Sequence, residues 1–168
     1  MLDLYIFDRK LRLLTLDAIE KIEVSLKAQI DTLMSTKYGC FRYTDTSLFK
    51  MKNKVFIEMY QRFLENVQTT KEKSNLLFVQ AYNQKYTEES FLPSWMMLES
   101  CTIGSMSAIL TLLNREDIRS IANFYNTSYK DLRKWTQFIV NVRNYSAHHE
   151  RIWNRNFGVR ARKNDILL

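Results

Sequence analysis

Glycine and proline, the residues that most often form turns, are scarce in this sequence, which contains three glycines and one proline among 168 residues. A fold of many short strands needs frequent turns, whereas long helices need few. Apolar residues make up 46% of the chain, enough to bury a core at this length. The sequence therefore predicts one all-α domain over residues 1–168.

Helical periodicity supports this prediction. From residue 7 to residue 34, apolar residues recur every three or four positions, which predicts a long helix with one broad buried face. That face comprises Leu11, Leu14, Ala18, Ile22, Leu26, Ile30 and Leu33. Gly39 is expected to end this helix. Further helices are predicted over residues 48–67, 75–86 and 93–113, then up to residue 125 after a turn at 114–117, and from about residue 128.

The last predicted helix carries the most informative segment. The two histidines of the chain, His148 and His149, are adjacent there, and Arg143 lies five positions before the first. The spacing predicts one buried face of this helix, formed by Leu132, Trp135, Phe138, Ile139, Val142 and Tyr145. Arg143 lies at the edge of that face, and Asn144 shares a face with His148. On an ideal helix Arg143 and His148 are about 140° apart, so one straight helix makes a poor catalytic pair of them.

Basic residues are concentrated around this segment. The chain has 25 lysines and arginines against 18 acids, a net charge of +7. Between residues 143 and 163 there are six basic residues and one acid, so this stretch holds +5 of the total (6 − 1). Such a local charge attracts polyanions, most commonly nucleic acid. For Arg160, Arg162 and Lys163, a solvated basic tail without a binding role is as good an interpretation as binding to a polyanion.

Cysteine usage and hydropathy indicate the cellular compartment in which the protein is expected. Cys40 and Cys101 form no C-x-x-C pattern, and the chain shows no secretory leader, so we expect reduced thiols in a cytoplasmic protein. No window approaches the roughly 18–20 apolar residues of a membrane span, so no membrane partner is expected.

Three segments together resemble a known family. The run from Arg143 to Arg155 is similar to the R-N-x-x-A-H-H-x-R-x-W-N-R form of the R-x4-H signature in HEPN-domain proteins, as found in bacterial Abi-like abortive-infection proteins. Residues 7–12 and 18–23 resemble the first long helix of that family, and residues 92–107 resemble its central Pro-Trp-Met helix. The chain is expected to lack the further N-terminal region that such proteins usually carry.

This resemblance implies an all-α bundle of the HEPN type. It also implies a metal-independent endoribonuclease, without cofactor, of an abortive-infection (phage defence) or toxin–antitoxin system. Catalysis would use His148 as general base or acid, Arg143 to hold phosphate oxygens, and Asn144 to orient either group. Substrate-binding residues would be His149, Arg151, Asn154 and Arg155. The expected partners are RNA, a second copy that completes a composite active site, and an antitoxin or non-coding RNA.

Other interpretations of the same residues stay open at this point. His148 and His149 could cap a helix C-terminus, where a cation meets the helix dipole favourably. Arg143 could form a structural salt bridge with Glu20, Glu23 or Glu99. A metal site at His148, His149 and Glu150 is disfavoured because adjacent residues rarely converge on one ion. The alternative functions are a non-catalytic RNA- or protein-binding module of a phage-defence system and a nucleotide-binding, antitoxin-like HEPN partner.

Overall fold

The computed structural model describes residues 2–158, and these residues form an all-α fold with no strand, as the sequence predicts. The basic residues Arg160, Arg162 and Lys163 lie outside the described residues. Two short 3-10 turns, at Arg42–Thr44 and Thr46–Leu48, follow the first helix. The seven α-helices of the described residues are α1 (Leu2–Lys37), α2 (Lys54–Lys73), α3 (Leu77–Lys85), α4 (Ser94–Ser100), α5 (Ile103–Leu112), α6 (Arg115–Phe124) and α7 (Tyr129–Ala147).

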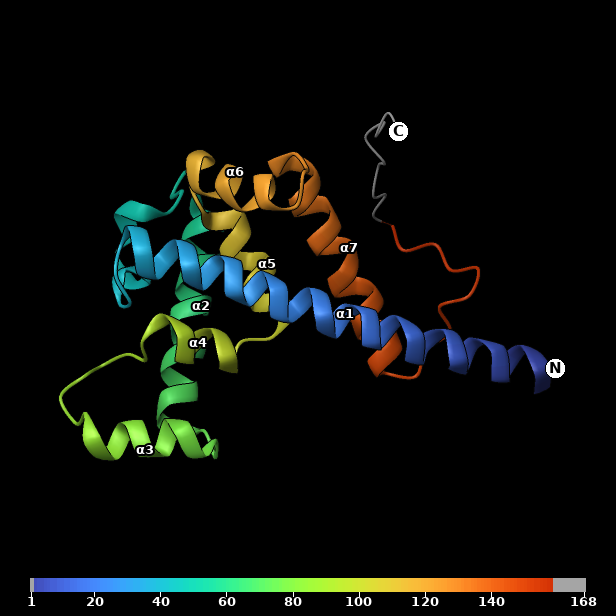
Figure 1. The fold of residues 1–168 in the computed structure, drawn as a ribbon, viewed down its shortest axis with the longest axis horizontal. Helices are drawn as coiled ribbons and strands as arrows, with labels where there is room; N and C mark the ends of the chain where they lie inside the picture. The colour runs from blue at the N-terminus through green and yellow to red at the C-terminus, as the bar shows by residue number, and fades with distance from the viewer. Residues whose placement is uncertain (1, 159–168) are drawn as a thin grey trace.

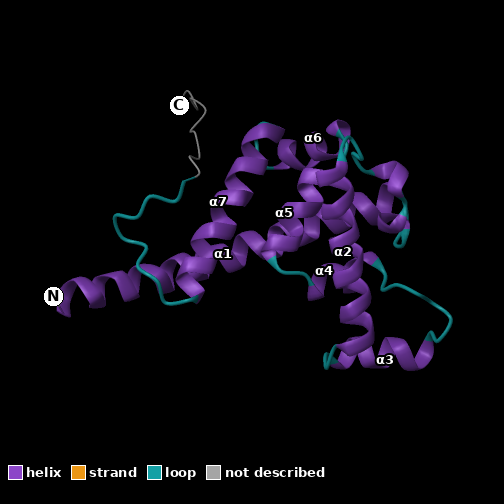
Figure 2. Ribbon diagram, turned by 180° about the vertical axis from the view of Figure 1, so that it is seen from behind, coloured by secondary structure: helices purple, strands orange, loops and turns teal. Residues whose placement is uncertain are grey.

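Helix α1 is the long element across which much of the fold is built (Figure 1). Helices α4, α5, α6 and α7 all contact it, while α5 packs between α2 and α7. Helix α3 lies at the far end of α2, as the view from behind also shows (Figure 2). The first turns of α1 project beyond the other helices, on the side where α7 ends. The end of α7 is therefore brought close to the beginning of the chain.

The hydrophobic core is centred on α5. Its residues Met106, Ile109, Leu110 and Leu112 are fully buried, and Ile30 and Met34 of α1 belong to the same cluster. Cys40 and Cys101 are both free thiols. Burial raises the pKa of the Cys101 thiol to about 11, so this sulfur stays protonated near neutral pH.

The buried face of α1 differs from the one predicted. It contains Ile19, Leu26, Ile30 and Met34, together with the charged residues Asp8 and Arg12. Leu14, Ala18 and Ile22, which the periodicity assigned to the buried face, are exposed. The prediction was wrong in the first half of the helix because apolar stripes lie on more than one side there, and the chain covers a neighbouring side.

Helix ends follow local capping chemistry. Gly39 has a φ of +92°, and its N–H donates to the carbonyl of Met34, so glycine ends α1 as predicted. The helix predicted over residues 93–113 is instead two helices, because the side chain of Thr102 accepts the N–H of Ser105 and begins α5 anew. The helix predicted over residues 48–67 instead runs from Lys54 to Lys73, as α2.

No helix in residues 2–158 has both the length and the apolar character that crossing a membrane requires.

Candidate active site

The helix that carries the candidate site, α7, begins at a reciprocal cap. The N–H of Asp131 donates to Ser128 Oγ at 3.1 Å, and this hydroxyl donates to Asp131 Oδ2 at 2.5 Å. The helix then buries Leu132, Thr136, Val142 and Ser146 against the bundle. Since α7 contacts α1, α5 and α6, its end is held at a fixed place on the fold.

Helix α7 ends just before the two histidines. His148 is the C-cap residue, and its N–H still donates to the carbonyl of Asn144 at 3.0 Å, so the predicted i,i+4 relation is retained. His149 adopts a left-handed conformation with φ +58°. The N–H of Glu150 donates to Tyr145 O at 2.9 Å and that of His149 to Ser146 O at 3.3 Å, the pattern of a Schellman motif. His149 therefore occupies the position that glycine usually takes.

The three residues predicted as catalytic lie together at this helix end with their side chains unengaged. Arg143 is half-buried, whereas Asn144 and His148 are exposed. Within residues 2–158, none of the three side chains makes a hydrogen bond or an ion pair. The salt-bridge interpretation of Arg143 therefore finds no partner among the described acids, and Glu23 pairs with Lys27 instead.

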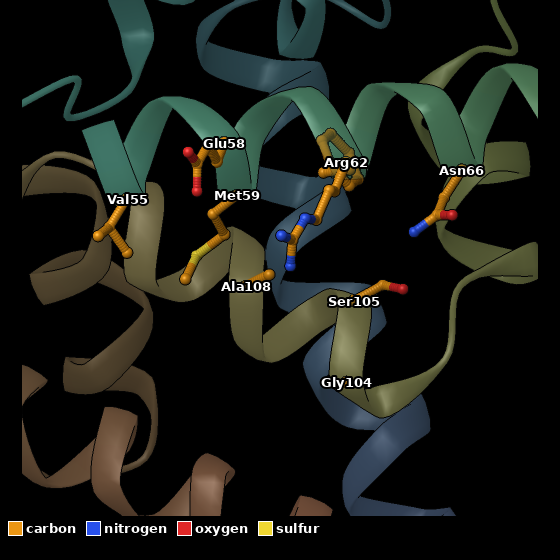
Figure 3. Close-up of a pocket in the computed structure, with 9 residues that line it drawn as sticks. Val55, Glu58, Met59, Arg62, Asn66, Gly104, Ser105 and Ala108 are labelled. Atoms are coloured by element: carbon orange, nitrogen blue, oxygen red, sulfur yellow. The ribbon is translucent and has the colours of Figure 1, made fainter. Parts of the chain in front are cut away.

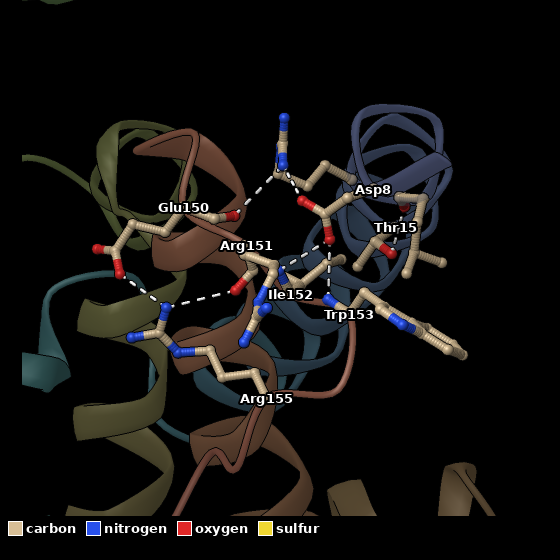
Figure 4. A network of polar contacts seen from close by, with 9 residues as sticks. Asp8, Thr15, Glu150, Arg151, Ile152, Trp153 and Arg155 are labelled. Carbon is tan, nitrogen blue, oxygen red and sulfur yellow. Dashed lines mark hydrogen bonds and ion pairs between the residues drawn. The ribbon is translucent and has the colours of Figure 1, made fainter. Parts of the chain in front are cut away.

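A buried charged pair fixes the loop that follows His148 (Figure 4). Asp8 and Arg12, one turn apart on α1, form a salt bridge and are almost fully buried. Asp8 Oδ1 accepts the backbone N–H groups of Ile152, at 3.1 Å, and Trp153, at 2.8 Å. Arg12 Nη1 donates to the carbonyl of Glu150 at 3.5 Å. These bonds join residues about 140 positions apart, so they tie the two ends of the described chain together.

Apolar contacts strengthen the same attachment. Ile152 is buried, and the indole ring of Trp153 meets the ring of Phe7 edge to face, with 5.1 Å between ring centroids. The sequence pattern identifies residues 7–12 only as part of the first long helix. It does not predict that Phe7, Asp8 and Arg12 hold this loop. A charged pair spaced i,i+4 looks like a solvated helix face unless the partner loop is known.

The predicted substrate-binding residues are placed on this loop in different environments. Arg151 and Asn154 are exposed, and Asn154 takes a left-handed turn conformation with φ +52°. Arg155 is occupied, because it donates to Glu150 Oε2 at 2.8 Å and its guanidinium lies 3.5 Å from the centroid of the Tyr145 ring. The loop is thus a turn packed on α1 and α7, in which the carbonyl of Arg151 accepts a hydrogen bond from Arg155 at 3.3 Å (Figure 4).

A separate pocket lies between α2 and α5 (Figure 3). It has a volume of about 290 Å³, and Arg62 of α2 reaches into it toward α5. Glu58, Asn66 and Ser105 also line it. None of the residues that the sequence predicted for the site contributes to this pocket. No group of three or more histidine, cysteine, aspartate or glutamate side chains among residues 2–158 is arranged to hold a metal ion.

Comparison with known proteins gives one match. The family model described as Abi-like protein matches residues 1–154, which includes α1, the α7 end and the loop up to Asn154. No curated protein and no solved structure matches the chain.

Proposed function

The chain belongs to the family of Abi-like proteins, and from this premise we propose that it is a metal-independent endoribonuclease of the HEPN type. Membership of the family indicates a role in abortive infection, a form of phage defence. The proposed part is the chemistry: cleavage of RNA through Arg143 and His148, in an abortive-infection or toxin–antitoxin system.

One observation carries the proposal. The side chains of Arg143, Asn144 and His148 have no hydrogen-bond or ion-pair partner in residues 2–158, while the loop directly after them is held by buried Asp8 and Arg12. A functional site requires reactive groups that are free to meet a substrate on a backbone that is fixed in place. A structural arginine that is half-buried, as Arg143 is, would be expected to use its donors within the fold.

The proposed reaction needs only proton transfer and charge stabilisation from the protein. The ribose 2′-oxygen gives its proton to a base and forms a bond to the adjacent phosphorus, while the bond from phosphorus to the 5′-oxygen breaks. The leaving 5′-oxygen takes a proton from an acid, which leaves a 2′,3′-cyclic phosphate and a 5′-hydroxyl. His148 would exchange these protons, and Arg143 would hold the non-bridging oxygens as negative charge grows there. Asn144 would orient the scissile phosphate.

One copy of the chain offers a single histidine in this role, whereas the reaction uses both a base and an acid. On an ideal helix, side chains spaced as Arg143 and His148 are would also project about 140° apart. We therefore propose a homodimer in which two helix ends face one cleft, so that one His148 accepts a proton while the other donates one. Exposed His149, Arg151 and Asn154 would contact the flanking RNA. Arg155, already paired with Glu150, would do so only after exchanging that partner.

The test is RNA cleavage by wild-type protein and by His148→Ala and Arg143→Ala. Both variants should lose cleavage by at least about 100-fold, the usual contribution of a general acid or base, and should stay folded. Lys134→Ala is the matched control for charge, since Lys134 is exposed on the same helix. Product ends should carry 2′,3′-cyclic phosphate, and EDTA should have no effect. Cleavage by His148→Ala at the wild-type rate would refute the assignment.

A second candidate, an RNA-binding module without catalysis, is favoured by another cluster. The guanidinium carbons of the exposed Arg115 and Arg119 lie 5.4 and 5.6 Å from the centre of the Tyr129 ring. Cations beside an aromatic ring are a common arrangement for single-stranded nucleic acid. Binding of RNA without any cleavage, retained in His148→Ala, would support this function over the nuclease. An antitoxin or a non-coding RNA would be the partner in either case.

A further inference from the structure

The first half of α1 carries an exposed apolar stripe with heptad spacing. Leu4, Phe7, Leu11, Leu14 and Ala18 are spaced three, four, three and four residues apart, which places them along one side of the helix. Leu14 is 71% exposed, Leu4 48% and Phe7 45%. We call these five residues the α1 seam. Such spacing is the pattern by which one helix packs along another.

Among residues 2–158, most of the bundle packs on another side of α1 than the seam, although the Trp153 ring contacts Phe7. That side contains Asp8, Arg12 and Ile19 and is roughly 100° around the helix from the seam. The first turns of α1, where the seam begins, also project beyond the other helices (Figure 1). A helix can therefore approach the seam beside the bundle without displacing an element of the fold.

We propose that the seam pairs with the same seam of a second copy, with the two α1 helices antiparallel across a two-fold axis. An isologous contact of this kind is self-complementary, because every contact between two different residues occurs twice across the two-fold axis. In one such register Leu11 faces Leu14 of the other copy and Phe7 faces Ala18, while Leu4 lies outside these apolar layers. The small Ala18 leaves room for Phe7 and for Trp153, which already packs on the Phe7 ring and is 47% exposed.

Charge complementarity selects this orientation. Lys10 and Asp17 both lie on the solvent side of the seam, seven residues apart, and both are exposed. In the antiparallel register Lys10 of each copy lies beside Asp17 of the other, which gives two equivalent pairs of opposite charge. Within one copy, Asp17 pairs with Lys21 of its own helix in an exposed contact of 2.8 Å. A shift of one heptad in either direction would place Lys10 beside Lys10, or Asp17 beside Asp17, of the other copy and so bring like charges together.

The pairing also bears on the candidate active site. Asp8 and Arg12, which hold the loop after His148, lie level with the middle of the seam along the axis of α1, on the adjacent side of the helix. The two-fold axis would place both loops on the same side of the helix pair. Only this consequence, a cleft shared by two loops, rests on the proposed function. Association itself is measured without RNA, so a failure of the seam and a failure of the nuclease are distinguishable.

The first experiment compares two neighbouring leucines by sedimentation equilibrium of the full chain. Leu14 lies on the seam, and Leu13, 58% exposed, lies on another side of the same helix. Leu14→Glu should weaken dimerisation on the order of 100-fold, because each dimer loses two buried leucine side chains. Leu13→Glu should change it by about twofold at most. A wild-type monomer at every concentration, or equal effects of the two variants, would overturn the proposal.

The second experiment tests orientation by charge exchange. Lys10→Glu and Asp17→Lys should each weaken self-association about tenfold, because each brings like charges together twice in the dimer. An equimolar mixture of the two variants should associate with nearly wild-type affinity, because every pair is then of opposite sign. Only the antiparallel register makes this prediction. A mixture that associates no better than the single variants would rule that register out.

Discussion

Asparagine in place of Asp8 would leave the shape of the buried network unchanged while removing its negative charge. Asp8 holds Arg12 and accepts two backbone N–H groups from the loop after His148. Asparagine keeps one acceptor oxygen for the two N–H groups, but neutral acceptors make hydrogen bonds weaker by about 1 kcal/mol each. Its amide group would face the guanidinium of Arg12, which is then left buried without a counter-charge.

The expected loss of stability depends on how the protein can relieve the unpaired, buried charge of Arg12. Breaking one partner of a buried ion pair costs about 3–5 kcal/mol, to which the weaker N–H bonds add about 2 kcal/mol. The loop can, however, detach from α1 and return Arg12 to water, which limits the cost to the local stability of that loop. We therefore expect Asp8→Asn to lower the free energy of unfolding by about 3 kcal/mol, with the loop released before the bundle unfolds.

Two measurements check this expectation together. Urea unfolding gives the free energy, and hydrogen exchange of a peptide covering residues 148–156 reports the amides of Ile152 and Trp153. The control is Glu58→Gln, since Glu58 makes an exposed i,i+4 contact with Lys54 and should change stability by less than about 0.5 kcal/mol. The reasoning is refuted if Asp8→Asn unfolds at the wild-type urea midpoint and those two amides keep their protection. RNA cleavage should fall in Asp8→Asn although Asp8 does not face solvent.

Three further predictions concern other parts of the fold. His149→Gly should raise the free energy of unfolding by about 1 kcal/mol in a urea titration, because glycine takes φ +58° without strain. A lower free energy of unfolding would show that the left-handed backbone at His149 does not cost stability. Arg133 donates to the carbonyls of Leu110, Thr111 and Leu113 at the end of α5, so Arg133→Met should destabilise by about 2–4 kcal/mol, and Arg133→Lys should restore little because one ammonium cannot bridge all three. Burial, and then the charge of Arg133, lowers the pKa of Lys50 from 10.5 to about 8. The unfolded state then binds more protons between these values, so stability should rise with pH from about 8 to 9.5, and Lys50→Met should flatten that rise.

The helical class and most helix positions could be predicted because they depend on local properties. Periodicity located α1 and α7, and Gly39 ended α1 where its backbone freedom indicated. The division between α4 and α5 was missed because apolar residues recur at helical spacing on both sides of Thr102, so its capping role has no distinctive signal. The polar end of α2 was taken for a break, yet an exposed last turn needs no apolar residue.

The composition of the buried face of α1 could not be predicted for a different reason. Periodicity shows which residues share a side of a helix, whereas the choice between two apolar sides depends on what other elements pack there. In the first half of α1, either the seam with Leu14 or the side with Ile19 could be the buried side. The bundle buries the side with Ile19, which also contains the charged pair Asp8 and Arg12. Asp8 and Arg12 look like solvent-facing charges in the sequence, because their partners are 140 residues away.

For the candidate site, the sequence located the segment but not its support. His148 and Arg143 could be chosen because histidine is rare and basic residues are concentrated nearby. The end of α7 at Ala147 and the left-handed His149 depend on the loop being drawn toward α1. The catalytic roles remain a prediction, which the cleavage assays address.

The same few turns of α1 are used twice, and this links association to the geometry of the site. One side of residues 4–18 holds the loop through Asp8 and Arg12, and the adjacent side forms the seam. Trp153 lies where the two meet, because its N–H bonds to Asp8 while its ring packs on Phe7. A second copy on the seam would cover that ring and so oppose release of the loop. In the proposed dimer, the hydrogen-exchange protection of Trp153 should therefore increase with protein concentration in the wild type and in Leu13→Glu, but not in Leu14→Glu. Protection independent of concentration in a dimerising protein would show that the site is complete in each copy and that the seam serves assembly alone.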